Sequence, residues 1–227
     1  RQMCIRDRLS SDERYGLQKC SVTVGYQLSY PDETISQLSP QECTKLKREG
    51  LYICMIKNPN PVAKNVTPQL SDAAFIREKV PMTKEEIRHV SICKLHLKSD
   101  SVLYDVGSGT GSIAVEAASL SDDMEVYAIE QKENAVQLIT QNKEKHGLEN
   151  IHVINAKAPD GMDNLPVPTH AFIGGSGGNL KEIIEALKAK NPHIRIVINA
   201  ISMETICEIK EIMSAYDVKN EDIVQLQ

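Results

Sequence analysis

The stretch Val102–Gly111 constrains the fold more than any other part of the chain. It reads Val-Leu-Tyr-Asp-Val-Gly-Ser-Gly-Thr-Gly, an apolar strand that ends near an acid and turns into three alternating glycines. A helix-forming stretch, Ser112–Leu120, follows at once. A bare backbone loop between the carboxyl end of a strand and the amino end of a helix is where α/β proteins normally hold a nucleotide-like ligand. The sequence therefore predicts a strand–loop–helix unit that binds such a ligand.

Strand and helix patterns alternate from this unit to the end of the chain. The expected strands are Val102–Val106, Glu125–Glu130, Ile151–Asn155, Ala171–Gly174, Ile194–Ala200 and Ile223–Leu226, and the expected helices between and after them include Glu133–His146, Asn179–Lys190 and Ser202–Tyr216. Such alternation predicts an α/β fold with a doubly wound, mainly parallel sheet. We expect the third strand to lie beside the first.

The N-terminal piece has a different pattern. Ser21–Leu28 and Leu51–Lys57 read as strands and Pro40–Arg48 as a short polar helix, which is too little for an independent core. A proline-rich break follows, so the expected organisation is residues 1–61, a linker over 62–74, and a main domain over 75–227. The first piece therefore has the character of the tail of a larger domain.

Charge and composition exclude several function classes. The net charge of −5 argues against a nucleic-acid binder, whose phosphate contacts need a basic face. No apolar run approaches the length of a membrane span, and no leader marks the chain for export. The six cysteines are scattered and the histidines lack ligand spacing, so we expect reduced thiols, no metal site and a cytoplasmic location.

The glycine loop and two acids indicate which ligand is bound. The loop consists of Gly107, Ser108, Gly109, Thr110 and Gly111, and Glu130 ends the next strand at a distance that suits hydrogen bonds to ribose hydroxyls. A carboxylate at Asp105 suits a sulfonium group and repels a pyrophosphate, which favours S-adenosylmethionine over NAD. The alternative is that Asp105 only caps amides of the loop, and the two roles are compatible.

A second glycine cluster follows the fourth strand and opens a helix. It comprises Gly174, Gly175, Ser176, Gly177, Gly178 and Asn179. Its amides at a helix N-terminus indicate an anion site on the same sheet edge as the first loop, and the alternative is a turn needed only for geometry. The glycine content exceeds what a connection needs, which favours the functional interpretation.

Two further features carry weaker local signals. Thr83-Lys84-Glu85-Glu86 is a capping-box pattern that starts a helix through about Leu95, and locally a cap is favoured over a ligand role for Thr83. Arg77, Lys79, Lys84 and Arg88 form a basic group that is usually a solvated face, although it could receive substrate carboxylates.

Four segments together carry a family resemblance. They are Phe75–Arg88, Asp105–Gly111, Phe172–Asn179 and Ile196–Ala200, and they resemble the decarboxylating precorrin-6B (cobalt-precorrin-6B) carbon-15 methyltransferases of cobalamin biosynthesis. The likeness covers about Phe75 to Gln227 and implies a Rossmann-like class I methyltransferase fold. The N-terminal piece looks like the end of a carbon-5 tetrapyrrole methylase domain. The chain thus resembles a fragment of a bifunctional precorrin-6Y carbon-5,15-methyltransferase that lacks a C-terminal hairpin.

The resemblance also implies roles for individual residues. S-adenosylmethionine is the implied cofactor, with the first glycine loop under its methionine part, Glu130 on the ribose and Ala158 at the adenine side. The resemblance also implies that Thr83 contacts the cofactor, which reverses the preference for a helix cap that its local sequence gives. Lys157 stands where many members carry an acid. The implied substrate is a polycarboxylate tetrapyrrole held by Gly174–Asn179 and nearby basic residues.

Partners and alternatives complete the expectations. The family implies a fused carbon-5 domain and a homo-oligomer, with neither nucleic acid nor membrane. We name no catalytic acid or base. The alternatives are a methyltransferase of another substrate such as RNA, against which the acidic charge and scarce aromatics weigh, and a non-catalytic methyltransferase-like assembly domain.

Overall fold

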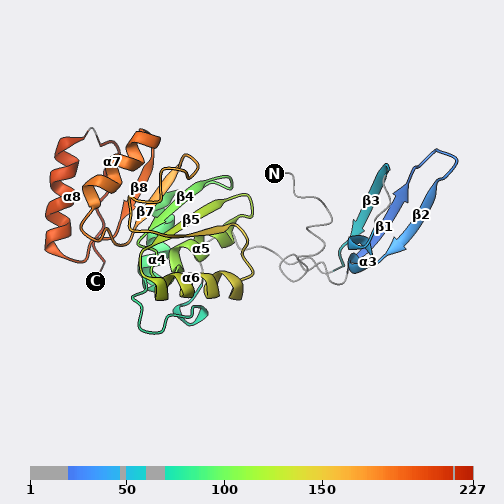
Figure 1. Ribbon diagram of the computed structural model, residues 1–227, viewed down its shortest axis with the longest axis horizontal. Coiled ribbons are helices and arrows are strands. Elements are labelled where there is room, and N and C mark those ends of the chain that lie inside the picture. The colour runs from blue at the N-terminus through green and yellow to red at the C-terminus, as the bar shows by residue number, and fades with distance from the viewer. Residues whose placement is uncertain (1–19, 47–49, 60–69, 217, 227) are drawn as a thin grey trace. The chain divides into compact units, whose positions relative to one another are not determined.

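The computed structural model describes residues 20–46, 50–59, 70–216 and 218–226 (Figure 1). The chain divides into two compact units, Arg1–Lys64 and Asn65–Gln227, which are described separately here. The expected domain boundary after residue 61 and most of the expected linker lie outside the described residues.

A parallel five-stranded sheet forms the centre of the second unit (Figure 1). Its strands are β4 (Val102–Val106), β5 (Glu125–Glu130), β6 (Ile151–Asn155), β7 (His170–Ile173) and β8 (Arg195–Ile198). Their order is β6-β5-β4-β7-β8, and all four pairings are parallel. This confirms the predicted α/β class with a doubly wound parallel sheet.

The strand order corrects one expectation. The third strand, β6, pairs with β5 and does not lie beside β4. The first two crossovers add strands on one side of β4, and the chain then returns to place β7 on the other side. The reversal between β4 and β7 is a topological switch point, where ligands of open α/β sheets bind beyond the carboxyl ends of the strands. Both glycine clusters follow these two strands.

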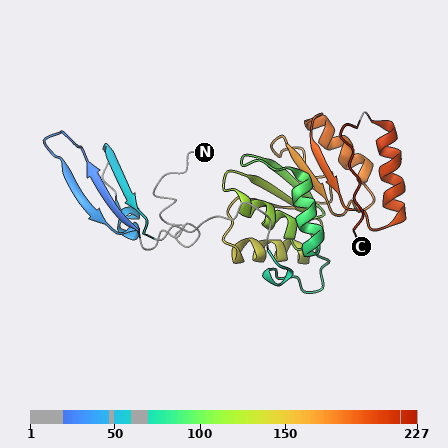
Figure 2. The same ribbon diagram turned by 180° about the vertical axis from the view of Figure 1, so that it is seen from behind.

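Five helices cover the two faces of the sheet (Figures 1 and 2). They are α4 (Glu85–Leu95), α5 (Ser112–Leu120), α6 (Glu133–Lys145), α7 (Leu180–Lys190) and α8 (Met203–Ala215). Residues of α4, α5 and α6 pack with Leu103 in one apolar cluster, and residues of α7 and α8 pack with Tyr104 in another. Adjacent residues of β4 thus face opposite layers, which explains why this strand is apolar throughout.

The expected strand Ile223–Leu226 is wrong. These residues form no regular element, and Ile223 is 81% exposed. The alternating pattern requires a neighbouring strand to take its backbone hydrogen bonds, and no described strand pairs with this segment.

The first unit contains one more strand than expected. Its sheet has the antiparallel order β2-β1-β3, with β1 (Ser21–Tyr26) between β2 (Thr34–Leu38) and β3 (Tyr52–Lys57). The short helix α3 (Pro40–Thr44) follows β2. A small apolar cluster centred on Val22 and Val24 fills one face, so the unit has a core of its own.

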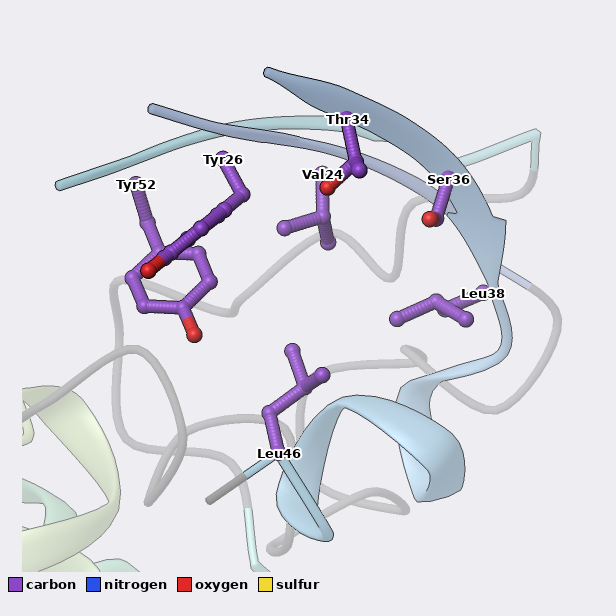
Figure 3. Close-up of a pocket in the computed structure, with 7 residues that line it drawn as sticks. All are labelled: Val24, Tyr26, Thr34, Ser36, Leu38, Leu46 and Tyr52. Atoms are coloured by element: carbon purple, nitrogen blue, oxygen red, sulfur yellow. The ribbon is translucent and has the colours of Figure 1, made fainter. Parts of the chain in front are cut away.

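A small pocket opens on this face of the first unit (Figure 3). Side chains from the three strands line it together with Leu46, which follows α3; the strand residues are Val24, Tyr26, Thr34, Ser36, Leu38 and Tyr52. None of its lining residues belongs to either glycine cluster. Among the described helices of the chain, none is long and apolar enough to cross a membrane.

Candidate active site

The first glycine loop needs all three of its glycines. Gly107, Gly109 and Gly111 have φ of +68°, +59° and +78°, in the left-handed region that favours glycine. A Cβ on Gly107 would lie 2.4 Å from the carbonyl oxygen of Gly175, and one on Gly109 would lie 3.0 Å from that of Pro81. The loop therefore lies against the second glycine cluster on one side and the segment before α4 on the other.

Asp105 supports this loop from below. Its side chain is fully buried, and its Oδ2 atom accepts hydrogen bonds from Ser108 Oγ at 2.6 Å and from the backbone N–H of Ala114 at 3.1 Å. Burial is the main cause that raises the pKa of Asp105 to about 7, and the nearby Glu130 charge adds to it. The structure thus shows the capping role, while direct contact of Asp105 with a cofactor stays a prediction.

Two polar atoms beneath the loop lack partners within the described part of the chain. They are Asp105 Oδ1 and Thr110 Oγ1, and both are buried. Unsatisfied buried polar atoms are uncommon in folded proteins, and each needs an explanation. Two of the three such atoms among the described residues lie at the glycine loop, and the third is Asn150 Oδ1.

Glu130 lies across the loop from Asp105, at the end of β5. Its Oε2 accepts from the N–H of Gly109 at 2.9 Å, and its Oε1 accepts from the N–H groups of Gln131 and Lys132, each at 2.9 Å. A carboxylate offers about four acceptor positions, so about one remains for a ligand hydroxyl. Glu130 is buried, with 8% of its surface exposed, so most of its carboxylate is shielded from bulk water by the protein.

The second glycine cluster joins three strand ends. The N–H of Gly174 donates to the carbonyl of Val106, which ties the cluster to β4. The side chain of Asn179 donates to the carbonyl of Ala158 at 3.0 Å, which ties it to the loop after β6. Gly177 and Gly178 have φ of +58° and +87°, so two successive residues adopt backbone conformations that favour glycine. The predicted substrate cluster and Ala158 therefore lie together with the first loop.

The segment before α4 corrects the predicted capping box. The N-cap of α4 is Lys84, one residue after Thr83, and no side chain caps it. The carbonyl of Thr83 instead accepts from Arg88 Nη1 at 2.8 Å. Arg88 thus binds the residue before the N-cap, and the helix begins at Glu85, one residue later than the local pattern indicates. Contact of Thr83 with a cofactor stays a prediction.

The basic group predicted near α4 is not a solvated face throughout. Arg88 is fully buried, and its guanidinium pairs with Glu116 at 3.1 Å and Asp72 at 3.1 Å. Lys84 also pairs with Asp72, at 3.3 Å. Sequence reasoning missed this network because its acids lie far from Arg88 along the chain. Within the described residues, no group of three or more histidine, cysteine or acidic side chains could hold a metal ion.

The geometry fits S-adenosylmethionine. A ligand can approach the backbone of the first loop closely because no Cβ intervenes, and Glu130 retains an acceptor for a ribose hydroxyl. The parallel sheet, the glycine loop after its first strand and the acid after its second define a class I S-adenosylmethionine-dependent methyltransferase.

Comparisons with known proteins narrow this class. A family model described as a precorrin methyltransferase domain matches residues 73–224. The chain therefore belongs to the precorrin methyltransferase family.

Individual relatives agree with the family. A protein of Pyrobaculum calidifontis named probable cobalt-precorrin-6B C(15)-methyltransferase (decarboxylating) is 39% identical over 143 residues, covering 62% of this chain and 73% of the relative. The Salmonella typhimurium protein named cobalt-precorrin-6B C(15)-methyltransferase (decarboxylating) is 36% identical over 160 residues, which is 70% of this chain and 82% of that protein.

A solved structure gives the same result for the fold. The crystal structure of precorrin-6Y C5,15-methyltransferase from Geobacter metallireducens matches with a TM-score of 0.63 and 34% identity. It covers 67% of this chain and 82% of that chain.

Proposed function

We propose that the chain is an S-adenosylmethionine-dependent C-methyltransferase that methylates carbon 15 of cobalt-precorrin-6B or precorrin-6B and removes the carboxyl group of a ring acetate. The observation that carries the proposal is the direct contact between the two glycine loops at the switch point of the sheet. One loop suits the cofactor and the other suits an anionic substrate, so the two are placed for transfer between them.

The residues of the first loop have binding and positioning roles. We assign the backbone of Gly107–Gly111 to the methionine part of the cofactor, Glu130 to the ribose, and Thr83 and Ala158 to its flanks. When bound, S-adenosylmethionine supplies an electrophilic methyl group. The conjugated macrocycle can take up the electron pair released when carbon dioxide leaves, so the proposal requires no nucleophilic side chain and names no general base.

The second loop and one lysine are assigned to the substrate carboxylates. The backbone of Gly174–Asn179 provides N–H groups, and a Cβ on Gly177 would lie 3.6 Å from Lys157 Cε and 3.4 Å from Gln131 Nε2. Lys157 is exposed and forms no ion pair with another described residue. Its ammonium group is therefore available to pair with a carboxylate of a polycarboxylate tetrapyrrole.

Three broader assignments belong to the same proposal. The first unit is the end of a carbon-5 methyltransferase domain, the protein acts as a homo-oligomer, and it works in the cytoplasm. The three-stranded sheet with its own core supports a separate domain in front of the methyltransferase. Cys43, Cys54, Cys93 and Cys207 are free thiols, which agrees with a reducing compartment.

The test is the mass of the product. The full chain is incubated with S-adenosylmethionine and cobalt-precorrin-6B, and we expect a product that has gained one methyl group and lost one carbon dioxide. The chain carrying Gly107→Ala serves as the inactive control. If a folded wild-type chain leaves the mass of the tetrapyrrole unchanged, the proposal is contradicted. If the tetrapyrrole gains a methyl group but loses no carbon dioxide, only the decarboxylation is contradicted.

A further inference from the structure

The segment Leu70–Thr83, called the strap below, is closed at its two ends by one side chain. Arg88 donates from Nη2 to the carbonyl of Leu70 and from Nη1 to that of Thr83, at 2.5 and 2.8 Å. Between these ends the strap runs along α6, as both views show (Figures 1 and 2). It ends beside the first glycine loop, because the carbonyl of Pro81 lies 3.0 Å from the place of a Cβ on Gly109.

Asn142 of α6 holds the middle of the strap and also holds the glycine loop. Its Oδ1 accepts from the N–H of Ile76 at 2.7 Å. Its Nδ2 donates to the carbonyl of Ile76 at 2.8 Å and to the carbonyl of Thr110 at 2.8 Å. Asn142 is fully buried, and all of these partners are backbone groups. One carboxamide thus joins the strap to the loop that we assign to the cofactor.

The orientation of this carboxamide is determined by its partners. Rotation by 180° would place the NH₂ group against the N–H of Ile76 and the oxygen against two carbonyl oxygens, which breaks all three hydrogen bonds. Truncation of Asn142 removes the partner of all three backbone groups. The bond to the carbonyl of Thr110 is buried and the two bonds to Ile76 are partly buried, so the truncation weakens the attachment of the strap to the loop and leaves the Thr110 carbonyl without this partner.

We infer that Asn142 is a positioning residue that sets the affinity of the chain for S-adenosylmethionine. It holds the strap, with Pro81 and Thr83, at the correct distance from the glycine loop. This inference rests on the proposed function of the loop. The groups that surround a binding site control its geometry although they do not touch the ligand.

Asn150 offers a matched control. It is also a buried asparagine, and its Nδ2 donates to three backbone carbonyls, those of Ala118, Ser121 and Met124, at 2.9 to 3.2 Å. These carbonyls lie at or beyond the end of α5, the end away from the glycine loop. Asn142→Ala and Asn150→Ala each remove three side-chain hydrogen bonds to the backbone, and only the first set includes the loop. The sets differ in that Asn150 only donates, since its Oδ1 has no partner among the described residues.

The experiment measures binding of S-adenosylhomocysteine by calorimetry and the melting temperature, on the full chain and both variants. We expect Asn142→Ala to raise the Kd about tenfold. Asn150→Ala should lower the melting temperature by a similar amount and leave the Kd within about twofold of wild type. At saturating S-adenosylmethionine, kcat of Asn142→Ala should equal that of wild type while KM for the cofactor rises, because only binding is altered.

Three results would overturn the inference. An unchanged Kd in Asn142→Ala does so, and so does an equal loss of affinity in Asn150→Ala, which would make the effect one of general stability. A folded wild-type chain that binds no S-adenosylhomocysteine overturns the proposed function and this inference with it. If Asn142→Ala does not fold, Asn142→Ser leaves a smaller void and is held to the same criteria.

Discussion

The two glycine loops look alike in the sequence, yet their glycines serve different purposes. In the first loop, a Cβ on Gly107 would lie 2.4 Å from the backbone of Gly175, and one on Gly111 would lie 3.1 Å from Ile139. In the second, a Cβ on Gly175 or Gly178 would meet nothing within 4 Å. The first loop is glycine-rich because neighbouring atoms leave no room for a side chain at Gly107 and Gly111. In the second loop, the space beside Gly175 and Gly178 is not filled by other protein atoms.

This difference separates packing from ligand recognition. A glycine that is sterically required reports on the fold and on the shape of the cofactor loop. Gly175 faces open space and lacks a positive φ, so neither packing nor backbone conformation requires a glycine there, and we take the space beside it to belong to the substrate. Gly107 and Gly175 give the clearest comparison, because their backbones lie against each other. A methyl group on Gly107 would overlap the backbone of Gly175, whereas one on Gly175 would contact no protein atom within 4 Å.

The largest effect is expected for Gly107→Ala. The methyl group would overlap the backbone of Gly175, and alanine is strained at a φ of +68°. We expect the free energy of unfolding to fall by about 2–4 kcal/mol and binding of S-adenosylhomocysteine to be lost. Urea denaturation and calorimetry measure the two quantities. Wild-type binding by this variant would contradict the tight contact between the loops.

Asp105→Asn tests how the first loop is supported. Burial is the main cause that raises the pKa of Asp105 in the folded protein from its usual value of 3.8 to about 7. The contribution of this group to stability is therefore fully present below about pH 3.8 and is lost as the pH rises through about 7. Asparagine does not titrate.

The variant should thus gain stability relative to wild type as the pH rises from about 3.8 to about 7, by up to about 1.4 kcal/mol per pH unit, and the gain should level off above that range. Urea denaturation of both proteins at several pH values measures the difference. A difference that stays constant with pH would show that Asp105 titrates normally.

Lys157→Met removes the cation near the second loop and keeps an unbranched side chain of similar reach. If the lysine pairs with a substrate carboxylate, KM for the tetrapyrrole should rise about tenfold, while the Kd for S-adenosylhomocysteine stays unchanged. Lys132→Met, which alters another exposed lysine of the same sheet edge, is the control. Equal changes in both variants would indicate a general charge effect and not a specific contact.

The smallest effect on the protein itself is expected for Gly175→Ala. Nothing lies within 4 Å of the added methyl group, so the melting temperature and cofactor affinity should match wild type. The tetrapyrrole must share this space under the proposal, so its KM should rise several-fold. Steady-state kinetics with the cofactor saturating tests this. If instead the variant is destabilised, the contrast between the two loops is wrong.

Much of this arrangement could be predicted from local patterns. The glycine loop, Glu130 and all five strands of the parallel sheet follow from short apolar runs, and β4, β5 and β7 end at or directly before a glycine or an acid. Those patterns depend on residues close together in the chain, so they survive without knowledge of the fold. The strand β2 was missed because most of its residues, in Thr34–Leu38, are polar and exposed.

The remaining site features depend on contacts between distant residues. Arg88 reads as a surface cation until Glu116, 28 residues away, is placed beside it in the core. The local sequence indicates that Thr83 is a helix cap, whereas in the fold its carbonyl accepts a hydrogen bond from the same arginine. Asn142 carries no local signal, because its role arises from partners 66 and 32 residues away, at Ile76 and Thr110. Such roles emerge only when the topology is known.

The most direct test of the central claim, that the first loop and Glu130 bind the cofactor, is calorimetric titration of the full chain and of Glu130→Gln with S-adenosylhomocysteine. We predict saturable binding of one molecule per chain in wild type and about tenfold weaker binding in the variant, because the amide cannot replace a carboxylate that accepts from three N–H groups and a ribose hydroxyl. A folded wild-type chain that releases no heat, or a variant with equal affinity, would contradict the account.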